Sequence, residues 1–435
     1  MHGNTKRYAK FALPLVVIAV ASCFMALLFY PMMNASMKNV PVAILSLDEG
    51  ATVQGKTVNI GDTLVDKVTE AASDSDGEPA IAWHEVDSQR QVDDGFDNRD
   101  YYAAVVIPKD FTAKQMDAKQ AAAKTQIESA TKLAQVMAQA QAKAQIAAQQ
   151  QGFTGAAAQR FVQKAAQEAV QKAVSTQQTA TTPATAAPEI KLVVDNAKSP
   201  MLANLLRQSL PVMLEKTGAT VKTTVLNEGG VTTNSSLPTA TMMGQNVLIM
   251  PVYMMSLIVS LLVANQLRRK SYDSRAQRWG SFGTQLGLAL VWSLGVALGA
   301  DCIFAMLGSG WLSASMVMFL WLASFALMTV FLGLMNIAVP LGLGCGVLGL
   351  GLGMTSGLFP AELLPAFWRD WIYGWVPQHF IGDGVRAVMY RGDGWWNAGS
   401  MPLLAVLCVG LLVFVCAGMM PVGRHKVAAT DSVAE

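Results

Sequence analysis

Five long apolar runs dominate the second half of this chain. They cover roughly residues 247–267, 282–304, 311–333, 337–356 and 401–421, and most charged residues fall in the gaps between them. A helix needs about 20 apolar residues to cross the hydrocarbon core of a bilayer. A sixth run covers residues 11–33. The pattern predicts a mainly α-helical integral membrane protein with six transmembrane helices, arranged as one plus five.

The N-terminal run, residues 11–33, could also be interpreted as a cleaved signal peptide. Residues 20–23, Val-Ala-Ser-Cys, resemble a lipoprotein cleavage site. A lipoprotein would turn polar after that cysteine, whereas here the apolar run continues through Phe29. We therefore expect residues 1–33 to form a cytoplasmic N-terminus followed by an uncleaved transmembrane helix.

Basic clusters beside three of the runs predict the orientation in the cell membrane. Positive charge next to a span marks the cytoplasmic side. All three clusters agree on cytoplasmic termini, a large extracellular domain at 34–243, a five-helix transmembrane domain at 244–421 and a cytoplasmic tail at 422–435. The clusters are Lys6, Arg7 and Lys10; Arg268, Arg269, Lys270, Arg275 and Arg278; and Arg424, His425 and Lys426.

The predicted extracellular domain mixes strand and helix patterns. Short apolar runs at 40–45, 81–86, 102–108 and 190–196 are typical of strands. Helices are predicted at 62–72 and at 200–216, the second with an apolar face formed by Leu202, Leu205, Leu206, Leu210 and Met213. All five cysteines fall in the predicted spans, so this α/β domain has to fold without disulfides.

Residues 112–178 have a different composition, rich in Ala, Gln and Lys, which favours helix. A break at 151–155 divides the segment, and we expect an antiparallel helical hairpin of the coiled-coil type, with a first arm of about 55 Å. A flexible low-complexity linker is the alternative. The apolar positions that would form the seam of the first arm are few: Met116, Ile127, Leu133, Val136, Met137 and Ile146.

Glycines in the apolar run at 337–356 match two different motifs. Residues 344–349 fit the dinucleotide fingerprint GxGxxG, but no strand-turn-helix context surrounds them and no acidic residue follows at the required distance. Small residues four apart instead favour close helix packing, within or between subunits. The glycines expected to pack in this way are Gly342, Gly346, Gly349 and Gly353.

Asp301 is the one carboxylate inside a predicted span, near its outer end. An intramembrane charge is a candidate functional site. A carboxylate at that depth can also simply reach water at the headgroups, which is the interpretation favoured here. Similarly, Asp48 and Glu49 are expected in a solvated turn after the first strand.

The sequence contains none of the catalytic or metal-binding motifs that were sought. The chain has no HExxH, GxSxG or P-loop motif and no Cys/His set with metal-ligand spacing. Catalysis, a cofactor and a metal site are therefore not predicted. The net charge of +2 is too small to suggest a nucleic-acid partner, whereas a composition of 52% hydrophobic residues fits the lipid bilayer as surroundings.

The loop before the last run, at 357–400, combines prolines with tryptophans. Trp368, Trp371 and Trp375 recur at helical spacing, which favours a short helix at the outer headgroup boundary. The prolines favour broken segments that dip into the membrane, and an aromatic belt without a transport role is the alternative. The residues of interest are Pro360, Pro365, Trp368, Trp371, Trp375, Pro377 and Arg386.

Three segments together resemble the YhgE/Pip family within the type-2 ABC exporter permeases. They are PVAILSLD at 41–48, YYAAVVIPKDF at 101–111, and 357–365 followed by Pro377, Gly382 and Arg386. The resemblance implies a six-span permease subunit with an extracellular domain, paired with itself or a related permease and driven by a separate ABC ATPase. The Ala/Gln-rich insert departs from the pattern, so the resemblance assigns it no role.

Two functions follow from these features. The first is an exporter subunit for an amphipathic or cell-envelope substrate, whose cytoplasmic loop at 268–278 docks on the ATPase. The same arginines are also explained by topology alone. The second is a surface protein that uses its long ectodomain for adhesion, secretion or phage attachment.

Overall fold

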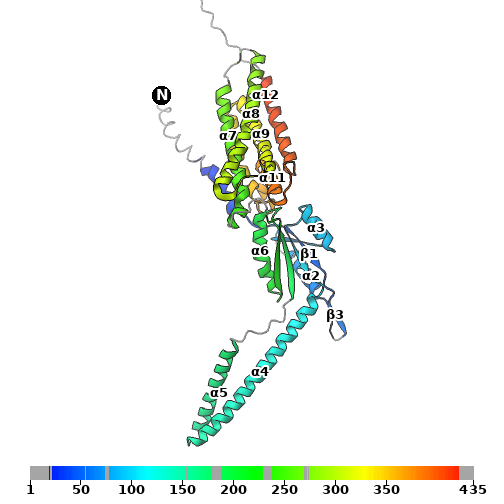
Figure 1. The fold of residues 1–435 in the computed structure, drawn as a ribbon, viewed down its shortest axis with the longest axis vertical. Helices are drawn as coiled ribbons and strands as arrows, with labels where there is room; N and C mark the ends of the chain where they lie inside the picture. The colour runs from blue at the N-terminus through cyan, green and yellow to red at the C-terminus, as the bar shows by residue number, and fades with distance from the viewer. Residues whose placement is uncertain are drawn as a thin grey trace, which may run out of the picture.

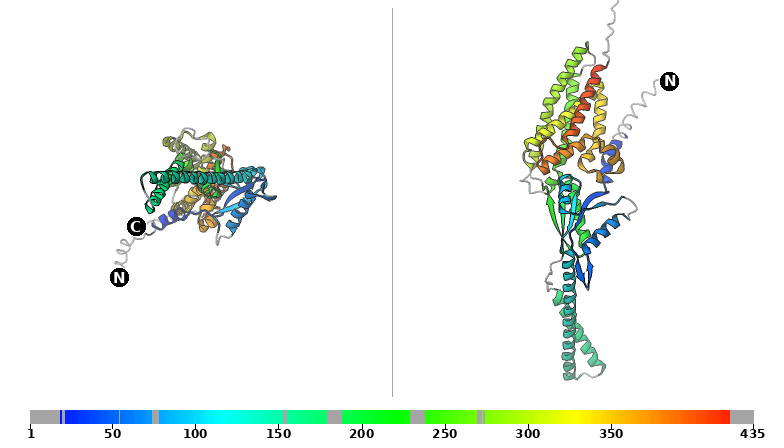
Figure 2. Two further views of the ribbon diagram at one scale, coloured as in Figure 1. Left: turned by 90° about the horizontal axis from the view of Figure 1, so that it is seen from below. Right: turned by 90° about the vertical axis from the view of Figure 1, so that its right-hand side faces the viewer.

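The computed structural model describes residues 19, 22–53, 55–73, 78–152, 155–178, 188–228, 238–268, 272 and 274–420. It has three parts along its long axis: a bundle of apolar helices, an α/β domain and a long helical arm (Figure 1). A view from the side shows that the arm continues beyond the α/β domain, away from the bundle (Figure 2). The α/β domain therefore lies between the other two parts.

A five-stranded sheet with the order β4-β1-β5-β6-β7 forms the centre of the α/β domain. β1 is parallel to β4 and β5, β5 is antiparallel to β6, and β6 is parallel to β7. The strands expected from the sequence are present, and β7 and a small β2–β3 hairpin are additional. The bounds are β1 Val40–Ser46, β2 Ala51–Val53, β3 Lys56–Val58, β4 Ile81–Glu85, β5 Ala103–Ile107, β6 Glu189–Asp195 and β7 Thr220–Leu226.

Helices cover both faces of this sheet because alternate strand residues point to opposite sides. Val42 and Ile44 belong to one core, which also holds residues of α2 (Ile60–Ser73) and α6 (Pro200–Glu215). Ala43 and Leu45 belong to a second core on the other face. There they meet α3 (Gln89–Asp97), a short helix with an N-cap at Ser88 that the sequence pattern did not reveal.

The buried face of α6 differs from the expected one. Leu202, Leu206 and Leu210 are buried as predicted, but Leu205 and Met213 are 37% and 38% exposed. Leu214 takes the next buried position instead. The buried residues are spaced four apart, so they follow a narrow stripe along the helix that excludes 205 and 213.

The arm consists of α4 (Phe111–Gln150) and α5 (Ala156–Gln178), packed against each other where the sequence predicts a helical hairpin. With 40 residues, α4 is about 60 Å long. The buried positions on the paired stretches are alanines, Ala144 and Ala148 on α4 and Ala166 on α5. Of the expected seam residues, Ile127, Met137 and Ile146 are exposed. The fully buried side chains of this contact are therefore small, whereas Leu133 and Val136 of the expected seam are half-buried.

Asp48 anchors the base of the arm instead of lying in a solvated turn. Its carboxylate is buried and accepts hydrogen bonds from the Gly61 amide at 3.0 Å, the Thr112 amide at 3.1 Å and the Thr112 hydroxyl. These donors lie in the first turns of α2 and α4, where unpaired amides favour a negative charge. One carboxylate thus fixes the end of β1 to the start of both helices.

Within the described residues, five helices of the bundle are long and apolar enough to cross a membrane. They are α7 (Pro238–Leu267), α8 (Arg275–Phe304), α9 (Ala314–Ile337), α10 (Val339–Leu358) and α12 (Ser400–Met419), and α9 packs against the other four. Of the predicted first span, only the helix Ser22–Met33 lies within the described residues. The basic residues at 6–10 and 424–426 lie outside them.

Local capping explains where these helices begin. Ser274 caps α8, accepting a hydrogen bond from the Gln277 amide at 3.2 Å, so this helix begins seven residues before the apolar run. Ser313 caps α9 in the same manner. α10 begins at Val339, with Pro340 in its first turn, where a missing amide costs nothing.

Candidate functional site

The loop between α10 and α12 belongs to the α/β domain as much as to the bundle. Its apolar side chains lie in the same buried core as the sheet residues Val42 and Leu192. Short helical turns at Ala361–Leu363 and Trp368–Ile372 direct those side chains inward. The residues that the loop contributes to this core are Phe359, Leu363, Leu364, Trp368, Ile372 and Val376. We call residues 359–376 the junction loop.

Hydrogen bonds and ion pairs reinforce this junction. The Tyr102 hydroxyl, at the start of β5, donates to Glu362 at 2.8 Å. The Lys38 amide donates to the Glu362 carbonyl at 3.0 Å, and Arg369 pairs with Glu78 at 3.0 Å. Burial raises the pKa of Tyr102, and the charge of Glu362 acts in the same direction, so the phenol stays a donor. Lys198 lies 4.1 Å from the centre of the Tyr102 ring.

A chain of charged groups follows on α11 (Pro377–Arg391). Arg386 is only 3% exposed, and its guanidinium pairs with Asp383 and approaches the Gly357 carbonyl at 3.5 Å. The other Asp383 oxygen lies 3.0 Å from His379 Nε2. Burial alone would raise the pKa of Asp383, but Arg386 and His379 lower it to about 2. Asp383 is therefore ionised at neutral pH and compensates the buried Arg386 charge.

The far end of α11 contacts the α/β domain directly. The Arg391 guanidinium donates to the Asp97 carbonyl at 2.8 Å, and Asp393 lies 3.9 Å from Arg99. Burial lowers the pKa of Arg99. Together with the junction loop, these contacts attach both ends of the segment between α10 and α12 to the same domain.

The four predicted packing glycines of α10 lie against neighbouring elements of the same chain. A Cβ on Gly342 would meet Met335 of α9, and one on Gly346 would meet Leu257 of α7. A Cβ on Gly349 would lie 2.6 Å from the Tyr253 hydroxyl, and one on Gly353 would lie 2.2 Å from Gln378 Oε1. The close contacts they allow are therefore internal to the bundle.

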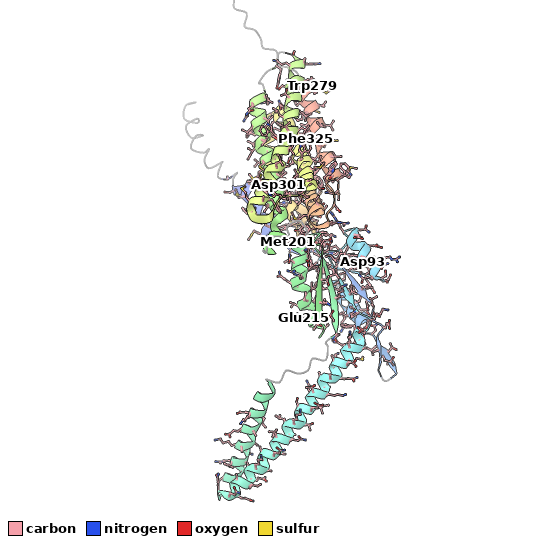
Figure 3. All side chains as sticks on the ribbon, in the orientation of Figure 1. Asp93, Met201, Glu215, Trp279, Asp301 and Phe325 are labelled. Carbon is pink, nitrogen blue, oxygen red and sulfur yellow. The ribbon has the colours of Figure 1, made fainter. Side chains whose placement is uncertain are left out.

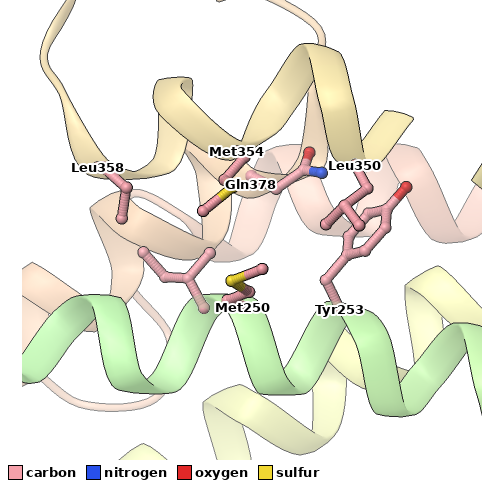
Figure 4. Close-up of a pocket in the computed structure, with 7 residues that line it drawn as sticks. Met250, Tyr253, Leu350, Met354, Leu358 and Gln378 are labelled. Carbon is pink, nitrogen blue, oxygen red and sulfur yellow. The ribbon is translucent and has the colours of Figure 1, made fainter. Parts of the chain in front are cut away.

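Side chains from α7 and α11 bind the backbone exposed by these glycines. The Tyr253 hydroxyl donates to the Gly346 carbonyl at 2.9 Å, and the Gln378 amide donates to the Gly349 carbonyl at 2.8 Å. Beside them lies a mostly apolar cavity of about 60 Å³ (Figure 4). Its lining comes from α7, α10 and α11: Ile249, Met250, Tyr253, Leu350, Met354, Leu358 and Gln378.

The three tryptophans predicted to share a helix do not share an environment. Trp368 is 6% exposed and stacks on Tyr30 at 5.5 Å between ring centres. Trp371 is 72% exposed, and Trp375 is also exposed, with its indole donating to the Trp371 carbonyl at 2.7 Å. Of these three tryptophans, only Trp371 and Trp375 are therefore exposed enough to contact lipid headgroups. Pro360 is buried, Pro365 is half-buried, and Pro377 begins α11.

The basic residues between α7 and α8 occupy different positions. Arg268 lies 3.4 Å from the Ile337 carbonyl, and Arg278 donates to the Met420 carbonyl at 2.5 Å. Arg275, the first residue of α8, is exposed. Arg269 and Lys270 lie outside the described residues. Two of the described arginines thus hold neighbouring helix ends, whereas Arg275 is exposed at the start of α8.

Asp301 was expected to reach water at the headgroups, but its side chain is buried. It is 9% exposed, and its carboxylate accepts the Leu312 amide at 2.7 Å. It therefore closes the turn between α8 and α9. Asp301 lies at the end of α8 near the α/β domain, whereas Trp279 lies at the far end (Figure 3).

The sequence singles out the loop at 357–400 but does not indicate most of its partners. Tyr102 and Glu362 are 260 residues apart, so no local pattern connects them. His379, Asp383 and Arg386 do carry a signal, because spacings of four and three place them on one helix face. No group of three or more metal-binding side chains occurs in the described part of the chain.

Comparison with known proteins gives one match. A family model described as ABC-2 family transporter protein matches residues 11–419. No curated protein and no solved structure matches the chain.

Replacing Gly353 by Leu is expected to lower the thermal stability of the purified protein. A side chain there would collide with Gln378 on α11, and overpacking of this kind costs about 1–3 kcal/mol. Gly344→Leu on the same helix is the matched control, because a Cβ at 344 meets nothing within 4 Å. Thermal unfolding in mild detergent measures both variants. Equal unfolding temperatures for the two variants would contradict the assigned packing.

Proposed function

Because the chain belongs to the ABC-2 family of transporter proteins, we propose that it is the permease subunit of an exporter powered by a separate ABC ATPase. The substrate is an amphipathic or cell-envelope molecule that moves outward. The observation that carries this proposal is the extent of the family match, which includes the bundle, the α/β domain and the arm. The chain itself does not hydrolyse ATP.

Within this family, the chain is a YhgE/Pip-type permease. The three segments that carry this resemblance meet at one place in the fold. Residues 41–48 include most of β1, residues 101–111 include β5, and residues 357–365 lead from α10 into the junction loop. Their proximity supports the proposal, because a shared structural unit explains why distant segments resemble one family together.

The α/β domain and arm lie outside the cell, with six spans and cytoplasmic termini. The position of α8 supports this orientation. Its Asp301 end faces the α/β domain, and Arg275 begins the opposite end, so the helix separates the basic loop from the domain (Figure 3). Positive residues favour the cytoplasmic side, which supports an extracellular position for the domain.

Cysteine labelling of intact cells tests this orientation. In a chain whose native cysteines are replaced, Arg90→Cys, Lys164→Cys and Gly394→Cys are expected to react with a membrane-impermeant maleimide, and Ala276→Cys to react only after lysis. All four positions are exposed, so burial does not limit the reaction. Labelling of residue 276 from outside would contradict the six-span orientation.

The loop at 268–278 docks on the ATPase, and Arg275 is the residue best placed for that contact. Arg268 and Arg278 are bound to helix ends, whereas Arg275 is exposed where α8 begins. From this point α8 packs directly on α9, the central helix. ATPase movement would thus reach the bundle through a continuous helix.

Arg275→Glu is expected to weaken ATPase co-purification roughly 10- to 100-fold and to abolish export, because a charge-assisted contact is worth about 1.5–3 kcal/mol. Membrane insertion is expected to persist, since Arg268, Arg269 and Lys270 remain. Arg275→Lys is expected to retain most of the interaction. Lys67→Glu, an exposed reversal in the α/β domain, is the matched control. Export that continues with the ATPase bound to Arg275→Glu would rule out this docking site.

Two such permease chains form the exporter, as a homodimer or with a related permease. The α10 glycines are occupied by contacts inside the chain, so the dimer contact lies elsewhere on the bundle. α7 presents an exposed apolar stripe, with Met254, Ile258 and Leu262 four residues apart. This stripe supplies a surface that is suited to a second bundle or to lipid.

A surface-attachment role is the second candidate, and the arm favours it. A helix of about 60 Å that points away from the bundle exceeds what packing of the α/β domain requires. A wild-type chain that captures no ATPase, and whose ectodomain binds a surface partner, would favour this role over export.

A further inference from the structure

Charge is segregated between the arm and the α/β domain. Residues 111–178 contain eight basic and three acidic residues, a formal net charge of +5. Residues 34–110 and 188–228 of the α/β domain together contain nineteen acidic and eleven basic residues, a net charge of −8. The whole chain carries only +2, so the arm holds more positive charge than the molecule in total. An excess of one sign on a projecting element creates a local field that attracts the opposite sign.

The positive charges of the arm are available at its surface. Lys114 forms an ion pair with Asp110 at 2.6 Å. Lys119, Lys124, Lys132 and Lys143 form no ion pair with any residue in the described part of the chain. All the basic side chains of the arm are exposed: Lys114, Lys119, Lys124, Lys132, Lys143, Arg160, Lys164 and Lys172.

The arm offers little apolar surface for a protein partner. Among the described side chains of the arm, the exposed large apolar ones are Ile127, Met137 and Ile146, which are nine or ten residues apart and therefore point in different directions around α4. Protein interfaces usually need a contiguous apolar centre. A partner of this arm is therefore recognised mainly by charge.

We propose that the arm binds an anionic cell-envelope polymer that carries phosphodiester groups along its length. The inference rests on the proposed outer placement of the α/β domain. The arm extends away from the bundle, so it leaves the surface of its own membrane and reaches into the surrounding envelope (Figure 2). Seven of its eight basic residues are lysines, compact point charges that bind phosphate without fixed geometry.

The geometry suits a long, flexible ligand. Lys124, Lys132 and Lys143 are separated by 8 and 11 residues, so at about 100° per residue they lie within about 100° of one another around α4. They span about 29 Å at 1.5 Å per residue. Lysines at this spacing can contact several units of one polymer at once, whereas a small anion would contact only one lysine.

The test measures binding of a synthetic poly(glycerol phosphate) chain to the full-length protein in zwitterionic nanodiscs over a range of salt concentrations. Replacing Lys119, Lys124, Lys132 and Lys143 by Gln is expected to weaken binding roughly 10- to 100-fold and to reduce the salt dependence, because fewer counterions are released. Gln also favours helix, so the arm is expected to stay folded, which circular dichroism checks. Lysine-to-arginine replacement at the same four positions is expected to retain binding.

The matched control changes the same charge elsewhere. Lys56, Lys67, Lys191 and Lys216 are exposed lysines of the α/β domain, and their replacement by Gln is expected to leave binding nearly unchanged. Equal weakening by both sets, or none by the arm set, would overturn the proposal. So would equally tight, arm-dependent binding to vesicles of anionic lipid, or a change of oligomeric state on removing the arm charges. The assay contains no ATPase, so its result is independent of whether the protein exports.

Discussion

The shared core of the α/β domain and the junction loop is the constraint on which the arrangement of the molecule depends. Six apolar side chains between Phe359 and Val376 complete a core that the sheet and α6 cannot close by themselves. Burying each side chain stabilises this arrangement by about 1.5–3 kcal/mol relative to leaving it exposed to water. Separating the domain from the bundle would expose all six together, so the two parts are expected to move as one unit at this point.

Polar groups give that junction a defined geometry. Apolar burial has no direction, but the Tyr102–Glu362 hydrogen bond and the Arg386–Asp383–His379 chain each require particular positions. A buried arginine without its carboxylate would be costly, and Asp383 supplies that carboxylate from the same helix. The contact of Arg386 with the Gly357 carbonyl, at 3.5 Å, then links α11 to the end of α10. In the proposed exporter, a motion that begins at Arg275 passes through α8 and α9 to α11 and reaches the outer domain there. The arm, anchored by Asp48, would follow that motion.

Much of the fold was predictable because its signals are local. Run length identified five apolar helices, short apolar runs identified four strands, and Ala/Gln composition identified α4 and α5. Side-chain environments were less predictable, since they depend on contacts between distant segments. Trp368, Trp371 and Trp375 have the same residue type and helical spacing, yet only Trp368 is buried, because Tyr30 and the domain core cover it. Likewise, nothing near Asp48 in the sequence indicates that Thr112 closes over it.

The distance between the α/β domain and the bundle tests the central claim of a rigid junction most directly. Spin labels at the exposed positions Lys67 and Ala314 would be measured by double electron–electron resonance in nanodiscs. The account predicts one narrow distance distribution, broadened when Leu364 and Trp368 are both replaced by Ala. It should stay narrow when the exposed Trp371 and Trp375 are replaced instead. A broad distribution in the unmodified chain, or no broadening by Leu364→Ala with Trp368→Ala, would contradict the account.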